Sequence, residues 1–235
     1  MLLPVVLRLF MRYRFGCKLL GYEFFGLNGL DAKLIDIIGN DQSYFVEIGA
    51  NDGFTASNTK HLELFHNWQG ILIEPIPDQA RRCRTHRRKS TKVFEAACVS
   101  FDYTETTIEL IYSNTMTVAL GGVSDISDRE EHAKSGIQFL PNTEETYRFH
   151  ATAQTMTSIF DEATSPSQME LLSLDVEGGE LEVLRGIDHT RFRFDWILLE
   201  SRNIGQISEF LTLNSYHFCE KLGDHYYLFK NMPKL

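Results

Sequence analysis

The stretch YFVEIGANDGF, residues 44–54, places a buried strand directly before a glycine turn. Apolar residues surround Glu47, and the turn that follows contains Gly49, Asn51 and Gly53. Glycine lets a ligand approach the backbone closely and adopts dihedral angles that other residues avoid. A carboxylate and two glycines at the mouth of a strand therefore predict a ligand site here.

Strand and helix patterns alternate around this stretch. Apolar runs predict strands, and amphipathic periodicity predicts helices. In chain order we predict a helix over 30–39, a strand over 43–49, a helix over 57–68, a strand over 70–77, a helix over 78–89 and a strand over 92–100. This alternation favours a parallel α/β sheet with helices on both faces.

The alternation stops at about residues 102–150, which we interpret as an insertion that forms a lid or wall. Strands are expected near each end of it, around a polar, turn-rich segment. The pattern then resumes with a helix over 156–163, a strand and helix within 169–187, a strand over 194–203, a helix over 204–214 and an antiparallel hairpin over 216–230. We therefore predict one main domain over 41–235, preceded by an N-terminal helical segment over 1–40.

Composition limits the functional classes. The chain has 235 residues with 43% hydrophobic content, enough for a substantial core, and its net charge of -9 argues against binding to nucleic acid. The scattered cysteines form no CxxC pair, which predicts reduced thiols in a cytoplasmic protein and neither a zinc site nor a disulfide framework. They are Cys17, Cys83, Cys98 and Cys219.

The N-terminal segment over 1–20 is apolar but is interrupted by Arg8, Arg12 and Arg14. The interruptions argue against a membrane span, and their positions argue against a signal peptide. A basic amphipathic helix of this kind suits peripheral contact with a membrane surface. The alternative is a helix that packs on the domain or on a partner chain, as in a homodimer.

The second predicted strand ends in Glu74, just as the first carries Glu47 near its end. An acid at this place can accept both ribose hydroxyls of a nucleoside. The turn spacing is G-x-x-x-G, which lacks the third glycine of the dinucleotide fingerprint, and its carboxylates would repel a pyrophosphate but attract a sulfonium. S-adenosylmethionine fits this pattern. An NAD-dependent oxidoreductase and a non-catalytic nucleoside-binding module on the same fold are the alternatives.

Three segments together carry a family resemblance: EIGANDGFTASNT from Glu47, WQGILIEPIP from Trp68, and LLSLDVEGGELEVLRGI from Leu171. The sequence from about Phe45 to Phe229 resembles the FkbM family of S-adenosylmethionine-dependent methyltransferases. The resemblance implies a Rossmann-like class I fold with a mostly parallel seven-stranded sheet whose last strand is reversed. It also implies methyl transfer to a hydroxyl of a sugar, glycan or secondary metabolite, as in polysaccharide biosynthesis.

The resemblance implies cofactor contacts along the ends of the core strands. The cofactor-binding residues predicted there are Glu47, Gly49, Ala50, Asn51, Asp52, Gly53, Asn58, Thr59, Glu74, Pro75, Ala97 and Asp175. The N-terminal segment over 1–40 and the insertion carry no family signature, so we expect them to determine acceptor choice.

The predicted catalytic acids are Asp175, Glu177 and Glu200. The first two follow the fourth core strand and the third ends the strand expected beside it, so their side chains should converge at one edge of the sheet. Glu177 has an alternative role as a cap for the helix that follows it. A hydroxyl is a poor nucleophile, and Asp175 is placed to accept its proton.

Two alternatives to this role of Asp175 stay open. A histidine, His61 or His150, can serve as the base. Asp175 and Glu200, with Asn203 nearby, can instead hold a magnesium ion, because magnesium prefers oxygen ligands. No D-x-D pair is present, which favours a metal-free site.

The basic run over 81–89 has two interpretations. It can bind the phosphate of a nucleotide-sugar or lipid-linked acceptor, or it can be the solvated face of a helix.

Overall fold

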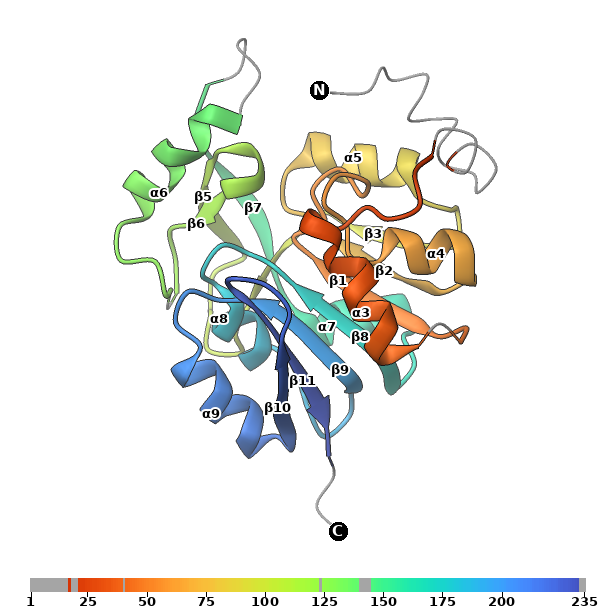
Figure 1. Cartoon of the computed structure of the whole chain (residues 1–235). Coiled ribbons are helices and arrows are strands. Elements are labelled where there is room, and N and C mark those ends of the chain that lie inside the picture. The colour runs from red at the N-terminus through yellow and green to blue at the C-terminus, as the bar shows by residue number, and fades with distance from the viewer. Residues whose placement is uncertain (1–16, 18–20, 40, 123, 140–144, 233–235) are drawn as a thin grey trace.

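The structure is a computed structural model that describes residues 17, 21–39, 41–122, 124–139 and 145–232 (Figure 1). The helix predicted over 1–20, with its membrane contact, lies outside the described residues except for Cys17. That side chain is fully buried with Phe25, Phe54 and Leu64. Within the described part of the chain, no helix has the length and apolar character needed to cross a bilayer.

The main sheet has seven strands in the order β10-β11-β9-β8-β1-β2-β3. β3, β2, β1, β8 and β9 run parallel, and β11 pairs antiparallel with both of its neighbours. This confirms the predicted seven-stranded sheet with a reversed last strand. The strands are β1 (Tyr44–Ile48), β2 (Gln69–Ile73), β3 (Lys92–Phe94), β8 (Gln168–Leu174), β9 (Arg193–Glu200), β10 (Tyr216–Lys221) and β11 (Tyr226–Asn231).

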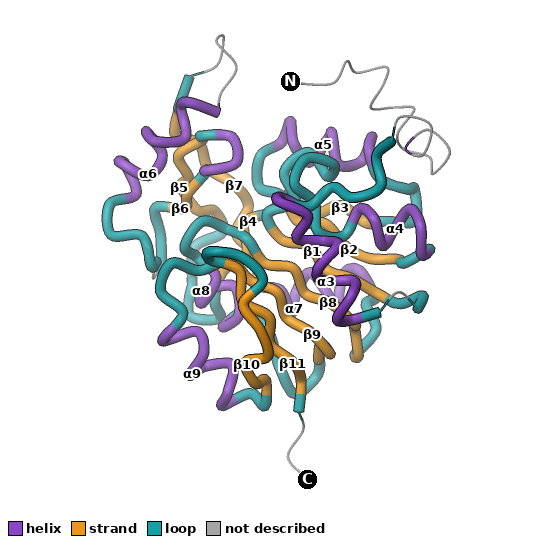
Figure 2. Tube along the Cα trace, viewed as in Figure 1, coloured by secondary structure: helices purple, strands orange, loops and turns teal. Residues whose placement is uncertain are grey.

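Helices cover both faces of this sheet, as Figures 1 and 2 show. One face carries α3 (Leu30–Ile38), α4 (Lys60–His66) and α5 (Pro77–His86), and a short 3-10 helix, η1 (Leu27–Gly29), precedes α3. The other face carries α7 (Met156–Ala163), α8 (Glu180–Arg185) and α9 (Gly205–Leu213). The two-faced arrangement predicted from the alternating pattern is confirmed.

Alternate side chains of each strand pack into the hydrophobic cores on the two faces of the sheet. In β1, Phe45 packs with the group under α3, whereas Val46 and Ile48 pack with the group under α7 and α8. All three side chains are at most 2% exposed. Because successive side chains of a strand point to opposite faces, Glu47 lies on the same face as Phe45, toward α4 and α5.

A second sheet lies beside the first and combines β4 with strands of the insertion, in the order β4-β7-β5-β6. Its strands are β4 (Ala97–Val99), β5 (Thr107–Tyr112), β6 (Val118–Ala119) and β7 (Tyr147–Thr155). The prediction of a single strand over 92–100 is wrong, because Lys92–Phe94 belongs to the main sheet and Ala97–Val99 to the second. The chain thus leaves the main sheet within that segment.

The polar segment of the insertion also contains a helix, α6 (Arg129–Ser135), between the short 3-10 helices η2 (Asn114–Met116) and η3 (Gly136–Phe139). The backbone N–H of Glu131 donates to the Asp128 carboxylate at 2.9 Å, which caps α6. Asp at the cap with Glu three residues later resembles a capping box, so the sequence did carry a signal for this helix.

Candidate active site

The glycine turn after β1 packs directly on the end of β8. Gly49 has a φ of 76°, and a side chain there would place its Cβ 1.7 Å from the carbonyl oxygen of Asp175. The Asp175 N–H also donates to the Ile48 carbonyl at 3.1 Å. Glycine at position 49 is therefore required for Asp175 to lie beside the turn.

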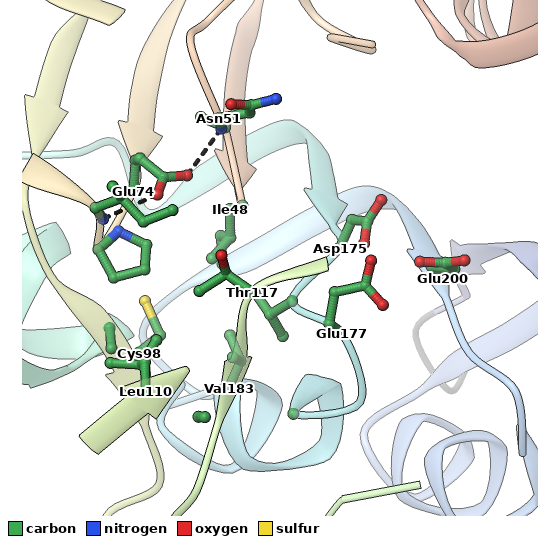
Figure 3. Close-up of a pocket in the computed structure, with 18 of the residues that line it drawn as sticks. Ile48, Asn51, Glu74, Cys98, Leu110, Thr117, Asp175, Glu177, Val183 and Glu200 are labelled. Atoms are coloured by element: carbon green, nitrogen blue, oxygen red, sulfur yellow. Dashed lines mark hydrogen bonds between the residues drawn. The ribbon is translucent and has the colours of Figure 1, made fainter. Parts of the chain in front are cut away.

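Glu74 joins the ends of β1 and β2. Its carboxylate accepts hydrogen bonds from the backbone N–H groups of Asn51 at 2.8 Å and Ile76 at 2.9 Å (Figure 3). The residue is 3% exposed, and burial raises the pKa of Glu74 to about 8. Each carboxylate oxygen keeps a further lone pair for a ligand.

Glu47 is engaged on several sides. It accepts from the hydroxyls of Ser57 at 3.0 Å and Thr59 at 2.6 Å and from the Asn58 N–H at 2.9 Å. It also forms a buried ion pair of 2.6 Å with Arg87. Arg87 comes from the basic run, and its side chain is fully buried, which neither interpretation of that run predicts. The contacts of Glu47 hold the turn against α4 and α5.

Asp52 and Gly53 support the turn from within the protein. The Asp52 carboxylate accepts from the backbone N–H groups of Phe54 at 3.0 Å and Thr55 at 2.7 Å. Gly53 has a φ of 71°, and a Cβ there would lie 3.1 Å from the Cα of Cys83. Both residues shape the turn from its inner side.

A cavity of about 410 Å³ lies where the carboxyl ends of the core strands meet the insertion. The predicted site residues that line it are Glu47, Gly49, Ala50, Asn51, Glu74, Pro75, Ala97, Asp175, Glu177 and Glu200. Four predicted cofactor residues are not among the lining residues, namely Asp52, Gly53, Asn58 and Thr59. In Figure 3, Glu74 lies on one side of Ile48 and Thr117 and the three acids lie on the other.

The three predicted catalytic acids converge. Asp175, Glu177 and Glu200 each place a carboxylate oxygen within 4.8 Å of those of the other two. Burial, followed by the charges of Glu200 and Glu177, raises the pKa of Asp175 well above its ordinary value. Burial also raises the pKa of Glu200. Such a pair resists carrying two negative charges at once, and a cation beside it would relieve the repulsion.

Tyr226, from the terminal hairpin, orients Asp175. Its hydroxyl donates to Oδ2 of Asp175 at 3.0 Å, and it lines the cavity. Tyr226 is not among the site residues predicted from the sequence, because it lies far along the chain from Asp175. The reversed strand β11 pairs with β9 and so brings Tyr226 to the site.

Glu177 is held by the guanidinium of Arg202 and contacts the ring of His132. Its Oε2 lies 2.9 Å from Nη2 of Arg202 and 2.9 Å from Nε2 of His132 on α6. Glu180, not Glu177, closes the turn before α8, because its carboxylate accepts from the N–H groups of Val176 and Gly178. The alternative of Glu177 as the helix cap is therefore wrong.

The acid cluster has the composition of a divalent-cation site, so the magnesium alternative stays open. Asn203 is not part of that group, and its N–H donates to Asp125 at 3.1 Å. The ion pair of Glu177 with Arg202 already offsets the charge of Glu177, which favours the metal-free site.

Neither predicted histidine base lies in the cavity lining. The ring of His61 contacts the Glu23 carbonyl at 2.7 Å and the His66 ring at 3.0 Å. His150 is exposed on β7. The structure thus leaves the carboxylates as the candidate bases.

The insertion is fastened to the acid cluster through Asp125. Oδ2 of Asp125 accepts from the hydroxyl of Ser201 at 2.9 Å and from the N–H groups of Arg202 at 2.7 Å and Asn203 at 3.1 Å. Its own N–H donates to the Gly178 carbonyl at 3.2 Å. These contacts make the insertion a fixed wall of the cavity.

Replacing Asp125 with alanine should release that wall. Hydrogen bonds to a charged group contribute about 1.5–3 kcal/mol each, so losing three should speed local opening at least tenfold. We expect faster amide hydrogen exchange over residues 118–122 and 124–136, with β1 and β8 unchanged. The matched control is Asp128→Ala, which should affect only the first turn of α6. Equal exchange in Asp125→Ala and the parent would show that other contacts hold the insertion.

Comparison with known proteins decides the family. The family described as Methyltransferase FkbM domain matches residues 47–229. The chain belongs to the FkbM methyltransferase family. The predicted resemblance is confirmed, and the protein is an S-adenosylmethionine-dependent methyltransferase. No curated protein is significantly similar in sequence.

Three similar solved structures share low sequence identity with this chain. A methyltransferase FkbM from Methylobacillus flagellatus KT is 14% identical with a TM-score of 0.42, covering 80% of this chain and 44% of that one. A precorrin-6y C5,15-methyltransferase from Geobacter metallireducens GS-15 is 13% identical with a TM-score of 0.43, covering 88% and 92%. A human methyltransferase 10 domain containing protein is 11% identical with a TM-score of 0.45, covering 87% and 83%.

Proposed function

We propose that this protein is an O-methyltransferase that transfers the methyl group of S-adenosylmethionine to a hydroxyl of a sugar, glycan or secondary metabolite. One observation supports this most directly. A single cavity contains the strand-end acid Glu74 on one side and the cluster of Asp175, Glu177 and Glu200 on the other. Its size falls within the range of small-molecule sites.

The cavity residues suit the cofactor in a defined orientation. Glu74 can accept the ribose hydroxyls, and Pro75 and Ala97 offer apolar contact to the base. When bound, S-adenosylmethionine supplies an electrophilic methyl group on a positively charged sulfur. Asp175 and Glu200 would face that charge, because the nucleoside end is directed toward Glu74.

The acids then act on the acceptor hydroxyl, with Asp175 as its base. Asp175 takes the hydroxyl proton as the carbon–oxygen bond forms and the carbon–sulfur bond breaks, with the electron pair staying on sulfur. Tyr226 keeps the Asp175 carboxylate oriented during this transfer. The wall formed by the insertion excludes water, so that much of the acceleration comes from positioning.

Binding and turnover test the proposal. In thermal unfolding, S-adenosylmethionine and its demethylated product should raise the melting temperature, and NAD should not, since only a bound ligand stabilises the folded state. Transfer of a labelled methyl group to an acceptor panel should then occur. Stabilisation by NAD alone would favour an oxidoreductase, and binding without transfer would favour a non-catalytic module.

A chelator separates the two interpretations of the acid cluster. Turnover should persist after chelation if Asp175 acts as the base. Loss of turnover that magnesium restores would instead assign the acids to a metal ion.

Three expectations from the sequence stay predictions. They are that the segment over 1–20 contacts a membrane surface, that the protein forms a homodimer, and that it is located in the cytoplasm.

A further inference from the structure

We propose that the part of the acceptor that enters the cavity carries no phosphate, sulfate or carboxylate group, and is either neutral or bears an amine. This inference rests on the proposed function and specifies the substrate class of the same site.

The charge of the cavity wall is the first argument. Six carboxyl groups line it, from Glu47, Glu74, Asp175, Glu177, Glu182 and Glu200. Among the described residues of the lining, none is lysine, arginine or histidine. A cavity lined in this way opposes the entry of an anion and favours a cation.

Two arginines that contact acids of the cavity lining are held in ion pairs. Arg87 is paired with Glu47 at 2.6 Å, and Arg202 is paired with Glu177 at 2.9 Å. Glu177 lines the cavity and already holds the guanidinium of Arg202 that a phosphate would need.

The glycine turn does not offer a phosphate cradle either. The N–H groups of Gly49 and Ala50 donate to the Ile73 carbonyl, and that of Asn51 donates to Glu74. The Gly53 N–H donates to the Ala50 carbonyl at 2.8 Å. Phosphate-binding turns work by aiming such N–H groups at the ligand, and here these four are used within the protein.

The basic run does not compensate. Arg81 and Arg84 are on α5, outside the cavity lining, and pair with Asp78 and Glu95. The hypothesis that this run binds the phosphate of a nucleotide-sugar or lipid-linked acceptor therefore finds no support in the cavity.

The same wall matches polyols and amines. Carboxyl groups offer acceptor lone pairs in either protonation state, and hydroxyls and ammonium groups donate hydrogen bonds to them. S-adenosylmethionine, with a sulfonium, an ammonium and one carboxylate, carries a net charge of about +1 and has the sign that the wall favours. A neutral or amine-bearing acceptor adds no negative charge to a cavity that already contains six acids.

Charge fractionation of natural acceptors tests this. A metabolite and glycan extract of the source organism is separated on ion exchangers into anionic, neutral and cationic fractions. Each fraction is incubated with the protein and methyl-labelled S-adenosylmethionine. We expect at least a hundredfold more label in the neutral or cationic fraction than in the anionic one. Comparable or greater label in the anionic fraction would overturn the inference while the methyltransferase function stands. Absence of label from every fraction, with the cofactor bound, would overturn the proposed function and this inference with it.

Glu177→Gln is the informative variant, because it removes a negative charge from the lining and frees Arg202 to attract an anion. The ratio of anionic to neutral label should rise at least tenfold. The matched control, Glu131→Gln, changes an exposed acid of α6 and should keep the parent ratio. An unchanged ratio in a folded Glu177→Gln protein would contradict the role of Glu177 in keeping anions out. If that variant does not fold, the distribution of label among the fractions treated with the parent protein decides whether the inference holds.

Discussion

Replacing Asp175 with asparagine is expected to lower kcat about a hundredfold or more, the range typical of losing a general base. Asparagine keeps the shape of the side chain but cannot take up the acceptor proton. Asp175 lies against the Gly49 turn, lines the cavity and receives the hydrogen bond of Tyr226. Cofactor affinity should change much less, because the nucleoside is assigned to Glu74.

The pH profile gives this prediction a second readout. Burial and the neighbouring acids raise the pKa of Asp175, so the carboxylate gains its proton at a higher pH than an ordinary aspartate. Activity should therefore fall as pH is lowered through that raised pKa and recover above it. Tyr226→Phe, which removes only the hydroxyl, should show a smaller loss of kcat. Parent-like turnover by Asp175→Asn would make Asp175 a structural acid and move the search to Glu177 and Glu200.

Much of the site was predictable because parallel strands deliver their carboxyl ends to one edge of the sheet. Glu74, Asp175 and Glu200 each follow or end an apolar run, and the strand that ends in Glu200 was expected beside the strand that precedes Asp175. The convergence of the acids follows from that topology. Local sequence was sufficient to place these residues at strand ends, and the order of the strands then brings them to one edge of the sheet.

Other features depend on tertiary contacts that no local pattern encodes. Asp125 reaches Ser201, and His132 reaches Glu177, only because the second sheet packs against the first. That packing has no sequence period. Nothing in the basic run over 81–89 indicates that Arg87 is the member whose side chain is buried and pairs with Glu47. The break between β3 and β4 was missed because both pieces are apolar and only two residues separate them.

Glu74→Ala should weaken cofactor binding tenfold or more, because a hydrogen bond to a charged group contributes about 1.5–3 kcal/mol. The carboxylate is buried at the end of β2 and faces the cavity with lone pairs that the Asn51 and Ile76 N–H groups leave open. Calorimetric titration with S-adenosylmethionine measures the loss. Acceptor affinity, measured with cofactor saturating, should change far less.

The raised pKa of Glu74 adds a pH signature to the same experiment. With a pKa of about 8 the empty site holds a proton at neutral pH, and two ribose hydroxyls can both donate only to the ionised carboxylate. Cofactor affinity should therefore increase as pH rises toward 8 and level off above it, by at most about tenfold per pH unit for one proton released. Glu74→Gln removes this proton while keeping the side-chain length, so its binding should lose that part of the slope. If Glu74→Ala binds as tightly as the parent, Glu74 has no place in the cofactor site, and its two backbone contacts make it only a clasp between β1 and β2.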